Sequence, residues 1–325
     1  MLDLPTPRVM WTIAAMLGVL ALGSLSRLAA LRSAAPDVAS RRRASLKTWW
    51  TLALLLTLAV CVGRIGVALL LIVASVLAVR EFARITGLDR SDRQGMVVVY
   101  GGILVYTALL SIGGNADWMP VAMLLVLGAV KAVAGQTQNY MRSVAGLFWG
   151  WAILGYAPAY ALRLYALPDR ALGTAGPSGA LLCIVILTSS SDIVQALIGR
   201  RIGRRRIAPM VSPRKSWEGF VGGIVITALL GLVLLPNLTA LGQTGISRTL
   251  LPSGVAPALL GALLGALLAV SGFFGDINVS AIKRESGVKD GSRLLPGQGG
   301  MIDRIDSLTF TAPVFYYSLR WLCEQ

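Results

Sequence analysis

Long apolar runs alternate along this chain with short polar segments. A helix that crosses a bilayer needs ~20 mostly apolar residues. The runs that approach this length lie at residues 9–30, 47–63, 65–80, 96–113, 118–135, 143–165, 178–198, 217–241, 255–275 and 306–322. The pattern predicts an all-α polytopic membrane protein with about nine or ten transmembrane helices.

The second and third runs are short, and only Gly63 and Arg64 separate them. They are compatible with a tight helical hairpin or with a re-entrant pair. We expect the polar, basic segment 33–46 before them to be a linker. We divide the chain into N-terminal transmembrane helices, residues 1–165, and a C-terminal catalytic transmembrane region, residues 166–325, that carries the polar motifs.

The composition agrees with a membrane protein. The 325 residues are 55% hydrophobic and 14% charged, and the mean hydropathy is +0.71. A soluble domain carries roughly 25% charged residues. No separate soluble domain is evident, and the three cysteines lie singly in apolar segments, which suggests neither a disulfide framework nor a metal site.

The net charge is +15, and the chain has no histidine. Such a charge can indicate nucleic-acid binding, but here the basic residues occupy short segments between apolar runs, as the positive-inside rule expects. We therefore expect membrane lipids rather than nucleic acid as partners. With the N-terminus outside, most of the 30 Lys and Arg residues fall in the cytoplasm, together with both polar motifs. The absence of histidine excludes a Ser-His-Asp triad and makes a zinc site improbable.

The stretch from Gly275 to Asp306 concentrates the candidate chemistry. It contains acidic residues, basic residues and glycines: Asp276, Asp290, Asp303, Asp306, Lys283, Arg284, Lys289, Arg304, Gly297, Gly299 and Gly300, with Gln298 among the glycines. Carboxylates hold hard cations such as Mg²⁺, Lys and Arg hold phosphates, and glycines let backbone N–H groups approach an anion. Asp303 and Asp306 share a face if helical, which suits two ligands of one metal, or one ligand with Arg304 as its partner.

A second polar stretch covers residues 189–219. Asp192 lies at the end of an apolar run, and Arg214, Lys215, Ser216 and Glu218 precede or open the next one. Ser216 is a plausible N-cap, and a helix N-terminus beside two cations is a candidate anion site. Two apolar runs separate the stretches, so both face the same side and can form one site. The structural alternative for Asp192 and Glu218 is a salt bridge with a nearby arginine.

These residues resemble the phosphatidate cytidylyltransferase (CDP-diacylglycerol synthase) family. The resemblance is carried by Ser280-x-x-Lys283-Arg284-x-x-x-x-Lys289-Asp290, by Leu295-Pro296-Gly297-Gln298-Gly299-Gly300-x-x-Asp303-Arg304-x-Asp306, and by the stretch from Ser191-Asp192 to Glu218-Gly219. The family usually has His at Gln298, and an Ala-Tyr pair where this chain has Gln195-Ala196. Gln298 can hydrogen-bond a phosphate or ribose oxygen, but it does not titrate near neutral pH.

The resemblance implies a Mg²⁺-dependent enzyme, with a second cation as an option. It would convert CTP and phosphatidate to CDP-diacylglycerol and pyrophosphate at the cytoplasmic surface of a bacterial inner membrane. Asp276 and Asp303 are the expected metal ligands. The expected catalytic group is Asp192, Lys283, Arg284, Lys289, Asp290, Arg304 and Asp306. The expected substrate-binding group is Arg214, Lys215, Ser216, Glu218, Gly297, Gln298, Gly299 and Gly300. A homodimer would fit the family.

Other functions remain open at this point. A related cytidylyltransferase could use a different lipid acceptor. A transporter or flippase could line a pathway with intramembrane charges, although these charges cluster on one side. Because of Gln298, a relative that binds nucleotide without turnover is a further alternative.

Overall fold

The computed structural model describes residues 5–30, 36–242 and 256–324, and its regular structure is almost entirely helical. The long helices are α1 (Pro7–Ala30), α2 (Pro36–Val62), α3 (Arg64–Thr86), α5 (Arg93–Ser111), α6 (Met119–Val133), α7 (Tyr140–Trp151), α10 (Gly176–Arg201), α11 (Trp217–Leu238), α13 (Ala256–Glu285) and α15 (Leu308–Glu324). Between them lie the short elements α4 (Leu88–Ser91), η1 (Ala152–Tyr156), α8 (Tyr160–Arg163), η2 (Leu164–Ala166), α9 (Asp169–Leu172), η3 (Gly173–Ala175), η4 (Ala240–Gly242) and α14 (Ile302–Ile305), and the strands β1 (Arg206–Ala208) and β2 (Ser212–Ser216).

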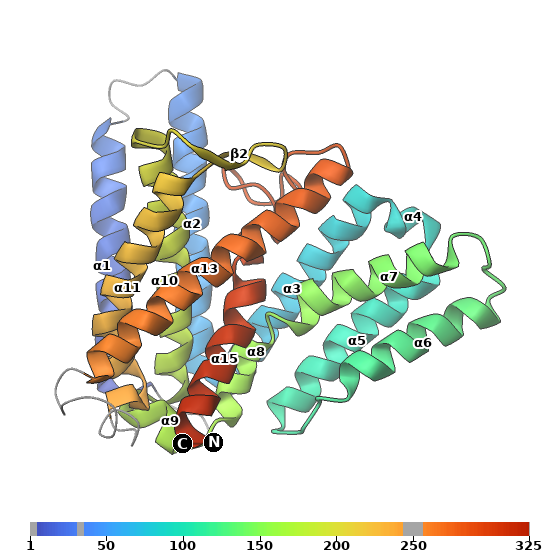
Figure 1. The fold of residues 1–325 in the computed structure, drawn as a ribbon, viewed down its shortest axis with the longest axis horizontal. Coiled ribbons are helices and arrows are strands. Elements are labelled where there is room, and N and C mark those ends of the chain that lie inside the picture. Colours follow the sequence, from blue (N-terminus) through green and yellow to red (C-terminus); the bar gives the residue numbers. More distant parts are fainter. Residues whose placement is uncertain (1–4, 31–35, 243–255, 325) are drawn as a thin grey trace.

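The helices form two adjoining groups (Figure 1). Helices α1, α2, α10 and α11 stand side by side, and α13 crosses them. Helices α3, α5, α6 and α7 form the second group, and α8 and α15 lie where the groups meet. The β1–β2 hairpin and the loop before α14 gather at one end of the molecule, here called the hairpin end. The first helix begins and the last one ends at the opposite end.

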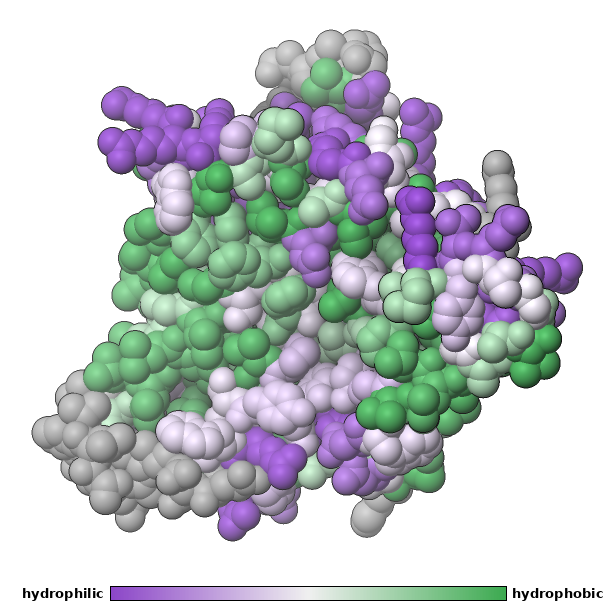
Figure 2. Space-filling view, turned by 45° about the vertical axis from the view of Figure 1, so that its right-hand side comes forward, coloured by the Kyte–Doolittle hydropathy of each residue, from purple (hydrophilic) through white to green (hydrophobic). Residues whose placement is uncertain are grey.

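Seven helices within the described residues are long and apolar enough to cross a membrane: α1, α2, α3, α5, α10, α11 and α13. Hydrophobic side chains cover the middle of the face shown in Figure 2, and hydrophilic ones gather above and below it. In a bilayer the backbone polar groups must be satisfied internally, and helices do this. The prediction of an all-α membrane protein is confirmed.

Fewer helices reach full length than the apolar runs suggested. The run 118–135 gives α6, with 15 residues. The run 143–165 is not one helix, because α7 passes into the π-helical turn η1, in which the N–H of Ala157 donates to the carbonyl of Ala152. The last run gives α15, with 17 residues. Hydropathy alone does not report such a break, since the apolar character continues through it.

Residues 47–80 belong to a helical hairpin rather than a re-entrant pair. Helices α2 and α3 have 27 and 23 residues, and the chain reverses between them at Gly63, where φ is +81°. Glycine adopts this conformation at no steric cost. The predicted linker at 33–46 is wrong for residues 36–46, which form the first turns of α2. Residues 33–35 lie outside the described residues.

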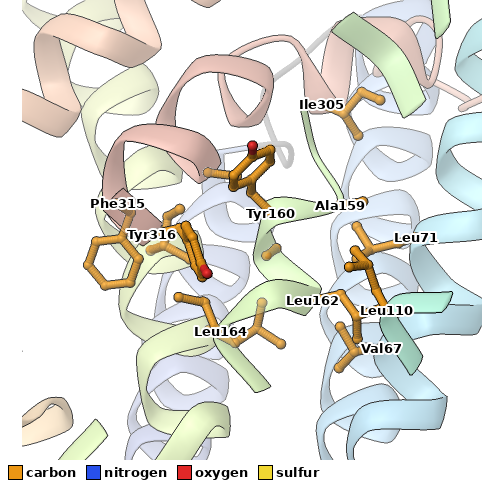
Figure 3. Packing of buried hydrophobic residues seen from close by; sticks show 14 of the residues in the cluster. Val67, Leu71, Leu110, Ala159, Tyr160, Leu162, Leu164, Ile305, Phe315 and Tyr316 are labelled. Carbon is orange, nitrogen blue, oxygen red and sulfur yellow. The ribbon is translucent and has the colours of Figure 1, made fainter. Parts of the chain in front are cut away.

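The buried core joins the two helix groups. Figure 3 shows Val67 and Leu71 of α3 and Leu110 of α5 beside Leu162 of α8, with Tyr160 close to Tyr316 of α15. Arg163 is buried here at 6% exposure. Its guanidinium pairs with Asp117 at 2.5 Å, lies 4.7 Å from the Tyr160 ring centre and donates to the Tyr106 hydroxyl. Pairing and ring contacts offset the cost of burying the charge.

Candidate active site

Strand β2 leads directly into α11 at the hairpin end. β1 and β2 pair antiparallel, with Arg206 opposite Ser216. The Ser216 hydroxyl accepts a hydrogen bond from the Gly219 N–H at 3.2 Å. This contact satisfies one of the free N–H groups in the first turn of α11. The predicted N-cap is confirmed.

Glu218 stabilises the turn before β1. Its carboxylate accepts hydrogen bonds from the backbone N–H groups of Arg204 at 3.0 Å and Arg205 at 3.2 Å. Its partners are backbone amides rather than the guanidinium groups that the salt-bridge alternative required. Glu218 therefore shapes the segment that places Lys215.

The two polar stretches meet through Lys215 and Asp276. Asp276 lies on α13, and one of its carboxylate oxygens is 2.7 Å from the Lys215 ammonium nitrogen. The other oxygen accepts from the Ser280 hydroxyl, one turn further along, at 3.1 Å. Lys215 also lies 4.6 Å from the Phe273 ring centre. The prediction that the stretches share one end and combine in one cluster is confirmed.

Asp192 of α10 and Asp306 adjoin this ion pair. The Ser307 hydroxyl donates to Asp192 at 3.0 Å, and the Ser307 N–H donates to Asp306 at 2.8 Å. Asp306 lies between α14 and α15. Burial raises its pKa well above the usual range, and the negative charges of Asp276 and Asp192 add to the rise. We call Asp192, Asp276 and Asp306 the carboxylate group.

A glycine permits the approach of α13 to Asp306. A Cβ on Gly275 would collide with the Asp306 carbonyl oxygen and would lie 3.1 Å from the Ser307 Cα. Real Cβ atoms do not reach such contacts without movement of the backbone. Gly275 therefore lets Asp276 and Asp306 occupy the same site.

Lys283 connects the carboxylate group to the loop that follows α13. Its ammonium group donates to Asp303 at 2.5 Å, and its positive charge acts on Asp306. The second oxygen of Asp303 accepts from the backbone N–H groups of Gly291 at 3.2 Å and Gly300 at 2.9 Å. Asp303 thus closes residues 291–303 into a compact loop, here called the glycine loop.

The glycine loop rests against α2. The Gln298 amide donates to the Ser45 hydroxyl at 2.8 Å, and the Thr48 hydroxyl donates to the Pro296 carbonyl at 2.9 Å. A Cβ on Gly297, where φ is +73°, would lie 2.8 Å from the Ser45 nitrogen. Gln298 therefore fastens the loop to α2 in this structure.

Glu81 of α3 holds the opposite side of the glycine loop. Its side chain is 5% exposed, and its two carboxylate oxygens accept from the Ser292 hydroxyl at 2.5 Å and from the Ile302 N–H at 2.9 Å. Glu81, Ser45 and Thr48 are not among the residues that the sequence motifs assigned to the site. An acid at the end of an apolar run signals Glu81, but the sequence has no comparable signal for Ser45 and Thr48.

Other expected site residues lie outside this network. Lys289 and Asp290 are exposed. Within the described part of the chain, neither side chain makes a hydrogen bond or an ion pair. Arg284 donates to the carbonyls of Val211 and Val288. The side chains of Arg214 and Arg304, two further basic residues expected in the site, are exposed.

The carboxylate group has the chemistry of a magnesium site. Across the described ranges, no three acidic or cysteine side chains are placed to hold a metal by themselves. Mg²⁺ is usually bound by one or two carboxylates, with substrate phosphates and waters as the other ligands. Asp276 and its neighbours Asp192 and Asp306 supply such oxygens, so these residues fit the ion. Asp303 would reach a metal only after releasing Lys283.

The chain is similar to known cytidylyltransferases over most of its length. A model described as "Cytidylyltransferase family" matches residues 43–322. A protein of Escherichia coli called uncharacterized protein YnbB is 34% identical, and the match covers 86% of this chain and 87% of that one. The phosphatidate cytidylyltransferase of Haemophilus influenzae is 30% identical over 77% of this chain and 88% of its own, and that of Thermotoga maritima is 30% identical over 75% and 85%. The chain belongs to the cytidylyltransferase family, as its motifs indicated.

Proposed function

We propose that the protein transfers the cytidylyl group of CTP to phosphatidate, giving CDP-diacylglycerol and pyrophosphate. Family membership supports the type of reaction. The observation that carries the proposal is the contact of Lys215 with Asp276, because it joins the two polar stretches beside Asp192 and Asp306. Carboxylates and lysines at one end of a helical membrane protein suit two phosphorylated substrates.

The reaction requires no covalent enzyme intermediate. A phosphate oxygen of phosphatidate attacks the α-phosphorus of CTP, the bond to the bridging oxygen of the β-phosphate breaks, and pyrophosphate leaves. The attacking oxygen is already anionic near pH 7, so no base has to deprotonate it. The protein has to position the phosphates and balance their charge, as in other phosphoryl transfers.

The lysines of the network are suited to that task. Lys215 and Lys283 each contact a carboxylate in the structure, and we propose that both turn toward phosphates when substrates bind. Arg304 and Lys289 are exposed, and in this proposal they would hold the departing pyrophosphate. The glycine loop would present backbone N–H groups to the nucleotide, and the start of α11 would face the lipid phosphate.

Magnesium forms part of the proposal. Asp276 would be a ligand, with Asp303 as the second expected ligand and Asp192 and Asp306 beside them. At these carboxylates, Mg²⁺ would supply positive charge against the charge that develops on the phosphates. Asp276 would exchange its bond to Lys215, and Asp303 its bond to Lys283, for a bond to the metal.

The proposed location is the cytoplasmic side of a bacterial inner membrane. Basic residues are concentrated in the polar segments at the hairpin end, as the positive-inside rule expects for a cytoplasmic face. CTP is a cytoplasmic metabolite, whereas phosphatidate stays in the bilayer. A site at this boundary would serve both.

The test uses purified protein in liposomes with Mg²⁺, phosphatidate and CTP labelled at the α-phosphate. We expect the label to enter the lipid phase, with one pyrophosphate released for each labelled lipid. CTP labelled at the γ-phosphate should leave the lipid unlabelled. Absence of transfer to phosphatidate, with transfer to another phosphorylated lipid, would contradict the acceptor and retain the reaction.

A different lipid acceptor is the second candidate. It is favoured by Gln298, which stands where the family usually has His. Parallel assays with other lipid phosphate monoesters decide between the two. The acceptor with the highest kcat/KM is the substrate of the enzyme.

A further inference from the structure

A pocket outside the carboxylate group contains three arginines. It has a volume of about 350 Å³ and lies between the end of α3 and the glycine loop. Its lining is Leu77, Arg80, Glu81, Arg84, Ser292, Arg293 and Leu294. Ligand pockets commonly have volumes from about 300 to 1,000 Å³. The pocket is therefore large enough for a small polar headgroup.

The charge of this pocket is strongly positive. Within the described ranges, no hydrogen bond or ion pair engages the side chains of Arg80, Arg84 or Arg293. Glu81 is the acid of the lining, but both of its oxygens accept hydrogen bonds from the glycine loop. Three guanidinium groups around one hollow repel each other, and an anion between them would relieve the repulsion.

The face of α3 that carries the arginines is apolar in the part of the helix that precedes them. Leu69, Val73 and Leu77 precede Arg80 and Arg84 at spacings that place all five on one side of the helix. Leu69 is 58% exposed and Val73 is 55% exposed, and Leu294 across the pocket is 48% exposed. An apolar stripe that ends at arginines matches acyl chains that end at a phosphate.

We propose that this pocket binds the headgroup of an anionic phospholipid. The phosphate would lie between Arg80, Arg84 and Arg293, and an acyl chain would follow Leu77, Val73 and Leu69 along α3. Because Arg293 belongs to the glycine loop, the lipid would connect that loop to α3 beside the Glu81 contact. The inference rests on the membrane fold and does not depend on the proposed reaction.

The test measures lipid retention by native mass spectrometry of the purified full chain. The probes are phosphatidylglycerol, phosphatidate and phosphatidylcholine at equal concentration. We expect the wild type to retain the anionic lipids in preference to phosphatidylcholine. The triple variant Arg80→Gln/Arg84→Gln/Arg293→Gln should lose at least about tenfold of that preference, because each basic residue near the surface strengthens binding roughly fivefold.

The matched control is Arg93→Gln/Arg142→Gln/Arg201→Gln, which removes the same charge from exposed arginines elsewhere. It should keep the wild-type preference. Retention of phosphatidate but not phosphatidylglycerol that persists in the triple variant would overturn the proposal, because the substrate site would then account for the bound lipid. Equal loss in both triple variants would overturn the proposal, because it would show a general charge effect. Displacement of the lipid by CTP alone would also overturn it in favour of a nucleotide site.

Discussion

Carboxylates at the hairpin end have two different kinds of partner. Glu81 and Asp303 accept hydrogen bonds from backbone N–H groups of the glycine loop, so their role in this structure is to hold that loop. Asp192, Asp276 and Asp306 are bound mainly by hydroxyl groups, a lysine and one backbone N–H. The second set is therefore better placed to exchange partners when a cation or a substrate arrives.

Replacement of Glu81 tests the first role. Glu81→Ala leaves the Ile302 N–H buried without its acceptor, and an unsatisfied buried group costs about 1–3 kcal/mol. We expect faster amide hydrogen exchange in residues 291–302 and a transfer rate reduced by about tenfold. Glu81→Gln keeps one acceptor oxygen, so its amide exchange rate and its transfer rate should lie between those of Glu81→Ala and the wild type. Unchanged exchange in Glu81→Ala would contradict the role.

The contact of Gln298 with Ser45 gives a pairwise test. Gln298→Ala and Ser45→Ala each remove the same hydrogen bond, which contributes about 1 kcal/mol. The double variant should therefore be no worse than the more impaired single variant. The measurement is kcat/KM for each member of this cycle. Fully additive losses would show that Gln298 acts on something other than Ser45.

At the scale of elements, close helix contacts place the carboxylate group. The Gly275 contact brings α13 to the start of α15. On α11, a Cβ added to Gly231 would lie 3.0 Å from the Gly265 Cα of α13. Small residues let helix backbones approach in this way inside membranes. These crossings determine where Asp276 lies relative to Asp192 and Asp306.

Gly275→Ala should separate α13 from Asp306. We expect a loss of about 1–3 kcal/mol of stability, as in other overpacked sites, together with reduced transfer. The matched control is Gly101→Ala in α5, where an added Cβ meets nothing within 4 Å. That variant should keep its activity and its Tm. Thermal unfolding in detergent gives the Tm of each variant, and equal Tm values for Gly275→Ala and Gly101→Ala would contradict the packing argument.

Sequence patterns predicted most of the long helices but not their details. The apolar runs indicated α1, α3, α5, α10, α11 and α13, because hydropathy over ~20 residues reports membrane burial directly. The runs did not indicate the first turns of α2, since residues 36–46 are polar and basic. That part of α2 carries Ser45, which contacts the glycine loop, and such a tertiary contact leaves no local pattern in the sequence.

At the scale of the whole molecule, residues from both regions build the site. The sequence predicted that residues 189–219 and 275–306 lie on the same side, because an even number of crossings returns the chain to that side. Glu81 and Ser45 are 221 and 253 positions from their glycine-loop partners Ile302 and Gln298. No periodicity or spacing links positions so far apart. The sequence therefore indicated that the two motifs lie together, but it missed the contacts by which α2 and α3 hold the glycine loop.

The most direct test of the account is the transfer rate of Asp276→Asn beside Glu285→Gln. Glu285 is an exposed acid at the end of the same helix, so the pair separates a site effect from a loss of charge. We expect Asp276→Asn to lower transfer of the α-phosphate label by about 100-fold or more, as the loss of one electrostatic group can do, while both variants keep the wild-type Tm. Full activity in Asp276→Asn would contradict the carboxylate group as the reaction centre.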